Sequence, residues 1–555
     1  MDDMSIWEKY SPILNPWFSS ELIYAGWGKA SFENPIGTVE GKTKINVNDL
    51  GDLKIEMEYE RLETKEPISS NSETFRILKF LHQYSGKNDR VVIGIGDGNK
   101  NPCSKLIVET GDGVFTSEEN ISWTALDFND RIVFWITRGT FEVTEKIKPK
   151  YWVAPLINYI SEFSRNQHPL LIQHPLRLYS TPTVLEIEDK DNKNNALLAA
   201  NRKNFLIGFE FGEKIGFIER LPDYSEKEQR LKSEQVRQCV TALMIGEITG
   251  NLENTTWFPH EYTNLLSFTS GSEVGASWLE FRNEEGKLVS RKHFSSHKTC
   301  YEKGYAVINE SLHGGTGHLI SVASNSSEFQ KSHIRVLINH LTQVSSYNRH
   351  LENRMTILIR AIEGISEKHG FGSQNLMDYL PVKYQQSVKE ILTETKHKTE
   401  KLMPQAQKEN LIEASIALRR IGNRVENANN KDGDFGLKVV DLLKFYKLPD
   451  SEIMEKHYSE TNSESRSWAS FLSQMRNDPI HTGYFEMEKG TYESDEIIKT
   501  QDHLHDILIR IVLKTLGYEG EYQPRVIDHL TDGKTVNWVT KESTLSDLGY
   551  KRNYS

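Results

Sequence analysis

The hydrophobic period of the sequence changes near Ser332, and this change constrains the fold more than any other feature of the chain. Before it, apolar and polar residues alternate in short stretches such as residues 53–59, which is typical of a β-strand with one face in water. After it, apolar residues recur at spacings of three and four, which is typical of amphipathic helices. No alternation of strands with helices appears in the first half, so antiparallel sheets are favoured over βαβ units. The sequence predicts an α+β multidomain protein with a β-rich N-terminal half followed by an all-α bundle.

Domain boundaries follow from the length and from this change of period. A chain of 555 residues exceeds what one core usually holds, so roughly two to four domains are expected. We expect a β-rich domain over 1–150, a second β-rich domain with a helical insertion over 151–331, a helical bundle over 332–530 and a C-terminal tail over 531–555. A short helix at Tyr151–Ile160 would form the seam between the two β-rich regions.

Local patterns predict the individual elements. A hairpin is expected where Ile45 and Val47 precede the alternating residues 53–59 across a polar turn. The other predicted strands are 91–95, 105–109, 131–137, 170–173, 183–187, 204–211, 215–219, 278–281 and 317–322, with a charged helix over 224–245. The predicted helices of the second half are 334–365 ending at Gly370, a solvated helix over 381–402, 408–427, 435–446, one bearing Trp468, and a last one over 504–516 capped by Gly517. They would form a bundle of five or six helices.

Composition bounds the environment of the protein. A formal net charge of −11 argues against a general nucleic-acid coat, so a nucleic-acid partner would need a local basic patch. Cys103, Cys239 and Cys300 are far apart, which predicts neither a disulfide framework nor a zinc ribbon and fits a reducing compartment. The N-terminus lacks the basic and apolar regions of a secretory signal, and no apolar run approaches the roughly 20 residues that span a bilayer. We therefore expect a cytoplasmic protein with no membrane partner.

A candidate functional site stands at a helix junction near the C-terminal end. Apolar residues at helical spacing predict a turn packed against a core: Trp468, Phe471, Leu472 and Met475. Asp478-Pro479 then disfavours continued helix, because proline lacks an N–H and restricts the preceding residue. Arg476 and His481 are therefore expected on packed scaffold that is open to a ligand. The guanidinium can neutralise charge on a phosphodiester, and the imidazole can move a proton near neutral pH.

The spacing of an arginine and a histidine is weak evidence by itself. Similar pairs occur at Arg76…His82, Arg291…His297 and Arg335…His340. The first and third enclose apolar residues typical of a core or a helix face, and the second lies in a Ser/Lys-rich segment. The pair at Arg476 differs because it joins an anchored helix to a break, with Asn477 directly after the arginine. The alternative interpretation is a helix C-terminus with a favourable arginine and a surface histidine.

Three other patterns suggest sites, but each favours a structural explanation. His293, His297 and Cys300 have the spacing of metal ligands, yet no fourth ligand is visible and Ser and Lys surround them, which favours a surface loop. The glycines of Gly94–Gly98 are followed by neither a helix nor a Lys-Ser/Thr pair, which argues against a phosphate-binding loop. His313–His318 has no adjacent carboxylate, so a tight turn is predicted.

The helical half resembles a HEPN domain, an all-α bundle whose Arg-polar-x-x-x-His motif follows an amphipathic helix. The motif reads Arg476-Asn477-Asp-Pro-Ile-His481 here, and Tyr347–Met355 with Ala361-Ile-Glu363 resembles the opening helix of such domains in bacterial abortive-infection proteins. With Tyr151–Asn158 at the seam of the β-rich half, the whole chain is similar to the ApeA family of anti-phage defence proteins.

The resemblance implies a metal-independent endoribonuclease that needs no cofactor and acts as a homodimer with two facing motifs. Arg476 would contact the scissile phosphate, His481 would be the acid and base, and Asn477 would hold the polar position after the arginine. Two histidines in a symmetric dimer could share the proton transfers when a ribose 2′-OH attacks phosphorus. The β-rich half would sense infection, with a phage-derived trigger as its partner, and restrain this RNA-cleaving toxin.

The sequence suggests two further candidate binding residues and two alternative functions. Arg420 and Arg424 are spaced to share one helix face and are candidates for binding the RNA backbone, although a solvated face explains them equally well. A non-catalytic HEPN-type module that binds RNA or protein is the alternative to a nuclease. A receptor whose β-rich half carries the function is the third hypothesis.

Overall fold

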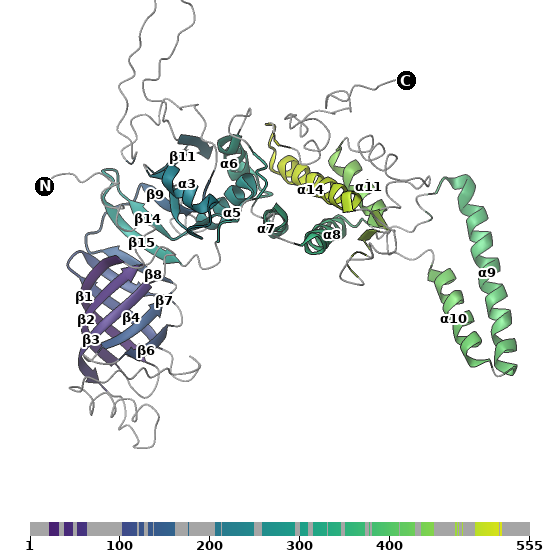
Figure 1. The fold of residues 1–555 in the computed structure, drawn as a ribbon, viewed down its shortest axis with the longest axis horizontal. Coiled ribbons are helices and arrows are strands. Elements are labelled where there is room, and N and C mark those ends of the chain that lie inside the picture. The colour runs from purple at the N-terminus through teal and green to yellow at the C-terminus, as the bar shows by residue number, and fades with distance from the viewer. Residues whose placement is uncertain are drawn as a thin grey trace, which may run out of the picture. The chain divides into compact units, whose positions relative to one another are not determined.

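The computed structural model of the chain comprises two compact units (Figure 1). The first unit extends to Lys331 and also includes Ser345–Asn348 and Leu516–Gln523, whereas the second begins at Ser332. The structure describes residues 21–32, 38–47, 53–63, 103–118, 121–126, 131–136, 138–160, 176, 206–211, 214–221, 223–248, 258–294, 300–302, 304–308, 315–329, 331–345, 350–371, 377, 380–409, 411–427, 435–448, 472–473, 475–476, 480, 485, 494–520 and 522–523.

A single antiparallel sheet forms the framework of the first unit. Along its main path the strand order is β10-β11-β12-β9-β14-β15-β8-β5-β4-β1-β2-β3-β7-β6, and β13 pairs with β9 beside this path. The strands are β1 (Glu21–Phe32), β2 (Thr38–Val47), β3 (Leu53–Glu63), β4 (Cys103–Thr110), β5 (Gly113–Ser117), β6 (Ser122–Leu126), β7 (Arg131–Ile136), β8 (Arg138–Val143), β9 (Tyr151–Ile157), β10 (Leu206–Phe211), β11 (Lys214–Arg220), β12 (Val240–Glu247), β13 (Gly275–Ala276), β14 (Trp278–Arg282) and β15 (Leu288–Phe294). The β-rich N-terminal half is therefore antiparallel, as its sequence pattern predicts.

The sheet continues through the boundary expected at residue 150, because β8 pairs with β15 and β14 pairs with β9. Among the described residues, two clusters of buried apolar side chains lie on this sheet. One cluster lies on the strands before residue 150 and contains Phe115 and Phe141, and the other contains Tyr151 and Trp278. One hydrogen-bonded framework thus carries both clusters.

The predicted hairpin of β2 and β3 is confirmed, with Val47 opposite Leu53 and Ile45 opposite Ile55. Along β2 every second residue from Val39 is buried. Because successive side chains of a strand point to opposite faces, this alternation leaves one face in water and fixes the register. The predicted strands over 105–109, 131–137, 204–211, 215–219 and 278–281 are confirmed as β4, β7, β10, β11 and β14, whereas those over 91–95, 170–173 and 183–187 lie outside the described residues.

The helix predicted at Tyr151–Ile160 is wrong, because this segment is the strand β9. Every residue from Tyr151 to Tyr159 is buried, and β9 pairs with β12, β13 and β14. A strand buried on both faces has no polar alternation, so its short apolar run has the same appearance as a buried helical turn.

Two further predictions in the first unit are wrong for related reasons. The helix expected over 224–245 ends early, since α3 spans Tyr224–Lys232 and the apolar run after it forms the buried strand β12. The strand expected over 317–322 and the turn expected at His313–His318 are replaced by α6 (Gly315–Asn325) where the chain is described. A Cβ on Gly317 would lie 2.1 Å from the Gly208 carbonyl oxygen, so this glycine permits α6 to pack closely on β10. The first unit also contains α5 (Phe258–Ser270), which the sequence patterns did not predict.

The second unit contains the helices α7 (Ser332–Ser345), α8 (Leu351–Lys368), α9 (Val382–Lys408), α10 (Ile412–Asn427), α11 (Phe435–Tyr446) and α14 (Ser494–Leu516). The single helix predicted over 334–365 is wrong, because α7 ends at Ser345, whose carbonyl accepts the Tyr305 N–H at 3.2 Å. The ends predicted at Gly370 and Gly517 are confirmed by left-handed φ values of 72° and 80°, which glycine adopts without steric cost.

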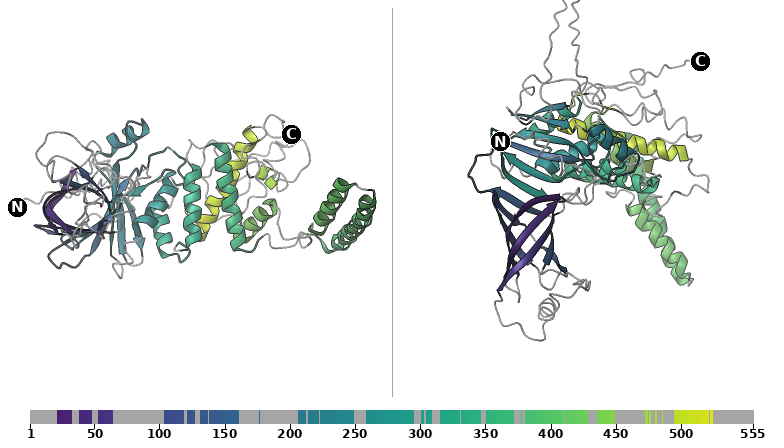
Figure 2. Two further views of the ribbon diagram at one scale, coloured as in Figure 1. Left: turned by 90° about the horizontal axis from the view of Figure 1, so that it is seen from below. Right: turned by 60° about the vertical axis from the view of Figure 1, so that its left-hand side comes forward.

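Helix α14 lies beside α8, where its Gln501 Nε2 donates to the Leu351 carbonyl at 3.0 Å (Figure 2). All residues from Thr500 to Leu513 are buried. Helices α9 and α10 lie side by side as a hairpin (Figures 1 and 2). In the part of the chain that the structure describes, no helix combines the length and apolar character needed to cross a bilayer.

Candidate functional site

Arg476 lies on a helical turn that is anchored by apolar side chains. Leu472 and Met475 are both 1% exposed, as the spacing of apolar residues predicts for the side that faces the core. The other two residues of that predicted stripe, Trp468 and Phe471, lie outside the described residues. Packing of this turn therefore holds the backbone of Arg476 in place.

The guanidinium of Arg476 is paired with Glu363 of α8. Nε and Nη2 of the arginine both donate to Oε1 of Glu363, at 3.2 and 2.8 Å. The remaining turns of α8 bury Leu358, Ile362 and Ile365, so the helix that carries this carboxylate is itself fixed by packing. Two charge-assisted hydrogen bonds to one oxygen therefore orient a planar cation.

Solvent reaches both partners of this pair, since the side chain of Arg476 is 28% exposed and that of Glu363 is 22% exposed. The cation is thus held in place, and its side chain is in partial contact with solvent. Such an arrangement suits recognition of a phosphate, because the fixed guanidinium needs little further ordering when the anion binds.

The structure locates only part of the predicted site. His481 and Asn477 lie outside the described residues, so their positions relative to Arg476 stay predictions. Arg420 is exposed on α10, in the same unit as Arg476, and Arg424 belongs to the same helix although its side chain is not described. Glu363 was noted in the sequence only as part of a helix motif, because a contact across 113 residues has no local signal.

The competing pair Arg335…His340 is part of an ordinary helix face, as the sequence predicts. Both residues lie on α7, where Leu337, Ile338 and Leu341 are buried. Burial lowers the pKa of His340, and the nearby positive charge of Arg360 lowers it further. A histidine held neutral beside an apolar stripe fits a packing role.

A buried charged network in the β-rich unit was missed in the sequence. Glu280 on β14 accepts from Arg282 Nη2 at 2.7 Å and from Arg291 Nη2 at 2.6 Å. Arg291 also donates to the Tyr24 hydroxyl at 3.2 Å, and that hydroxyl lies 3.3 Å from His293 Nε2. The available signal was the alternation of Glu280 with Arg282 and of Arg291 with His293, because residues two apart share one face of a strand.

The electrostatics of this network follow from its burial. Burial alone would raise the pKa of Glu280, but Arg282 and Arg291 offset that effect and lower it below the ordinary value. Burial lowers the pKa of His293 well below its usual range, and Arg291 adds to the shift. The surface loop predicted for His293 is therefore wrong; Cys300 is exposed, and His297 lies outside the described residues.

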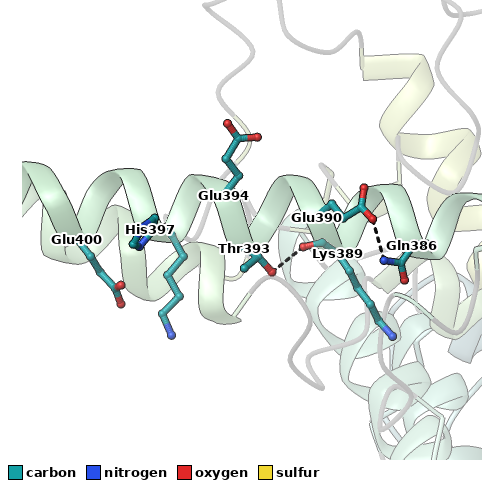
Figure 3. Close-up of a pocket in the computed structure, with 8 residues that line it drawn as sticks. Gln386, Lys389, Glu390, Thr393, Glu394, His397 and Glu400 are labelled. Atoms are coloured by element: carbon teal, nitrogen blue, oxygen red, sulfur yellow. Dashed lines mark hydrogen bonds between the residues drawn. The ribbon is translucent and has the colours of Figure 1, made fainter.

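Two other features of the described residues were considered as sites: clusters of metal ligands and the polar surface of α9. Among the described residues no cluster of three His, Cys, Asp or Glu side chains could hold a metal ion. Helix α9 carries the polar side chains of His397, Glu394 and Lys389, but Figure 3 shows them projecting from a single helix, with Glu394 directed away from Lys389. Without convergence from a second element they form a solvated surface.

The comparisons with known proteins leave the chain without an assigned relative. No family model matches the sequence, and neither a curated protein nor a solved structure matches it.

Proposed function

We propose that the protein is a cytoplasmic anti-phage endoribonuclease that cleaves RNA without a metal ion, with the β-rich unit as its sensor and regulator. The observation that carries the proposal is the Arg476–Glu363 pair, in which a packed helix holds an oriented and partly exposed cation. The motif Arg476-Asn477-Asp-Pro-Ile-His481, which resembles that of HEPN ribonucleases, adds a proton carrier and a polar residue to this cation.

In the proposed reaction a ribose 2′-OH attacks the adjacent phosphorus and the 5′-oxygen leaves. Arg476 neutralises the charge that builds on the non-bridging oxygens, His481 transfers protons, and Asn477 holds the polar position after the arginine. One histidine cannot be both acid and base in a single step. We therefore place two motifs in a homodimer of the helical unit, with a histidine from each copy at one cleft.

The decisive experiment compares four proteins in cells and with purified RNA: the wild type, Arg476→Ala, His481→Ala and His340→Ala. We expect the first two variants to fold normally by circular dichroism and to lose both RNA cleavage and phage protection. His340→Ala is the matched control from the competing pair, and it should not give a folded protein that lacks activity. Cleavage by the wild type should persist in EDTA and leave cyclic-phosphate ends, because a 2′-OH mechanism needs no ion.

A folded His481→Ala protein that retains full cleavage would overturn the assignment of this site. If that variant instead binds RNA as the wild type does, and neither protein cleaves it, the helical unit is a non-catalytic binding module.

A further inference from the structure

A cluster of side-chain rings lies where α8 and α11 end, in the helical unit that also contains Arg476. Its members are His369, Phe371, Phe445 and Tyr446. The centroid of the Phe445 ring lies 4.4 Å from that of His369 and 5.0 Å from that of Tyr446. It lies 5.5 Å from that of Phe371. Contacts with several rings therefore fix the orientation of Phe445.

Phe445 is nevertheless open to solvent. It is 54% exposed, which is the largest exposed fraction of any aromatic residue in the part of the chain that the structure describes. A single exposed apolar residue is ordinary on a protein surface. An exposed ring that its neighbours hold in place is different, because little conformational freedom is lost when a flat ligand stacks on it. The cluster is therefore suited to a ligand that carries a flat ring of its own.

Lysines surround the end of α11. Lys444 and Lys447 stand on either side of the two α11 rings in the sequence, and both are exposed. Nζ of Lys514, on α14, donates to the Lys447 carbonyl at 3.3 Å. Burial lowers the pKa of Lys514, and the positive charges of Arg510 and Lys447 lower it further. These cations repel one another, so a bound anion would relieve the repulsion.

Two carboxylates lie on the same helices and offset this charge only in part. Glu367 precedes His369 by two residues, a rotation of roughly 200° that sets it on the opposite side of α8. Asp441 lies one turn before Phe445 and is only partly exposed. The surface beside the rings is therefore positive, although the whole chain has a formal net charge of −11. Such a local basic patch is what a nucleic-acid partner requires.

Both helices that carry the rings also contact the turn of Arg476. Glu363 of α8 binds the guanidinium, and the N–H of Gly436, in the first turn of α11, donates to Ser473 Oγ at 2.9 Å. His369 follows Glu363 by six residues, which is about 9 Å along a helix axis. An RNA strand whose phosphate meets Arg476 can therefore bring a nearby base to the rings.

We propose that the ring cluster and its lysines form a base platform, on which an unpaired base of the RNA substrate stacks while the lysines bind neighbouring phosphates. The inference rests on the proposed endoribonuclease function and adds its substrate class, which is RNA with an unpaired stretch beside the cut phosphate. Bases in a duplex stack on one another, whereas an unpaired base can stack on a protein ring. An acidic peptide would match the lysines, but a nucleic acid supplies flat rings and phosphates in alternation.

The test measures how tightly the full-length protein binds a short unpaired RNA, by fluorescence anisotropy. The 2′-hydroxyls of this RNA are methylated, so that none can attack the phosphorus. Phe445→Leu should weaken binding by about tenfold, because leucine keeps the apolar contact and loses the face on which a base stacks. Phe445→Tyr keeps that face and should bind as the wild type does. A duplex of the same sequence should bind the wild type and Phe445→Leu equally.

Tyr384→Leu is the matched control for the loss of an exposed ring beside a lysine. Tyr384 is 51% exposed on α9, and Lys383 Nζ lies 4.7 Å from the centre of its ring. It lies outside the base platform, so the variant should bind the unpaired RNA as the wild type does. Lys447→Gln tests the phosphate contacts separately. It should leave stacking intact and reduce the slope of log affinity against log salt by about 0.7.

Several results would overturn the base platform. Phe445→Leu could keep full affinity for the unpaired RNA, or Phe445→Tyr could bind as weakly as Phe445→Leu. An equal loss of affinity for the duplex would exclude recognition of an unpaired base. Loss of helicity in Phe445→Leu would show that the ring serves folding instead. A wild type that does not bind unpaired RNA would also overturn the platform and leave the rings as a surface for a protein.

His481→Ala separates this proposal from the nuclease assignment. The variant should bind the methylated RNA as the wild type does and should not cut the unmodified one. If it still cuts, the catalytic assignment fails, and the affinity of Phe445→Leu alone decides on the base platform. If it does not cut and Phe445→Leu binds normally, the nuclease assignment stands and the base platform fails.

Discussion

Two arginine–carboxylate pairs, one in each unit, have similar hydrogen bonds and very different surroundings. Arg291 and Glu280 join neighbouring strands at 2.6 Å, and the carboxylate is fully buried. Arg476 and Glu363 join two helical segments at 2.8 Å, and solvent reaches both. The chemistry of the contact is the same, so the difference in role must come from access to water.

The difference in solvent exposure determines how much each pair contributes to the stability of the fold. A buried pair is costly to break because its surviving partner keeps a charge that water no longer solvates. A pair in contact with water adds little to stability, since the two ions are solvated when apart. The network around Glu280 is therefore explained by folding alone, whereas the Arg476–Glu363 pair adds little to stability, and the role proposed for it lies in the chemistry of the site.

The largest effect on stability is expected when the carboxylate of Glu280 is neutralised. Glu280→Gln leaves Arg282 and Arg291 buried beside a neutral amide, and we expect a loss of about 3–5 kcal/mol in the free energy of unfolding. Chemical denaturation followed by circular dichroism measures this loss. Glu284→Gln is the control, because its ion pair with Lys150 is exposed and should contribute little. A loss below about 1 kcal/mol for Glu280→Gln would contradict this account of the network.

A smaller loss is expected on acidification, through His293. The folded-state pKa of this residue is depressed by burial and by Arg291, so the neutral imidazole stabilises the fold above the unfolded-state value. Stability should fall as the pH drops below about 6.5, by up to roughly 1.4 kcal/mol per pH unit, until the folded-state pKa is reached. Thermal unfolding between pH 8 and pH 5 measures the slope.

His293→Gln provides the comparison for this slope. The variant should show a flatter dependence on pH, whereas the contribution of His340, whose pKa is also depressed, stays the same in both proteins. Equal slopes in the wild type and in His293→Gln would show that His293 does not take up the proton on unfolding.

A still smaller change in stability is expected when the partly exposed Arg476–Glu363 pair is broken. Arg476→Ala should lower the free energy of unfolding by at most about 1 kcal/mol, even though RNA cleavage should be lost. Glu363→Gln should fold equally well and reduce cleavage only partly, because it loosens the guanidinium without removing it. If Arg476→Ala unfolds the helical unit, this arginine is structural and the comparison between the two pairs fails.

The smallest effect is expected in the coupling energy between Arg476 and Glu363, which should depend on the salt concentration. A double-mutant cycle of Arg476→Ala and Glu363→Ala should give a coupling of about 0.2–1 kcal/mol at low ionic strength, because exposed pairs interact weakly. Raising the salt concentration to about 0.5 M should remove most of that coupling, whereas the loss caused by Glu280→Gln should change little. A coupling that is insensitive to salt would mean that water does not reach the pair.

Sequence patterns predicted best those elements that have one face in water. The hairpin of β2 and β3 was predicted from its alternation, and α11 from its helical period with the bounds it has in the structure. Prediction failed where both faces are buried, as in β9 and β12, because no polar residues mark the period. It also failed at the end of α7, where a contact with the distant Tyr305 interrupts a pattern that could have continued.

The sequence by itself determined the change from strands to helices near Ser332 and the apolar spacing that buries Leu472 and Met475, because each is a matter of local spacing. Only the tertiary structure decided that Glu363 orients Arg476, that Glu280 binds two arginines out of reach of water, and that one sheet continues past the boundary expected at residue 150. These contacts join residues far apart in the chain. Their energies depend on burial, which local spacing does not specify.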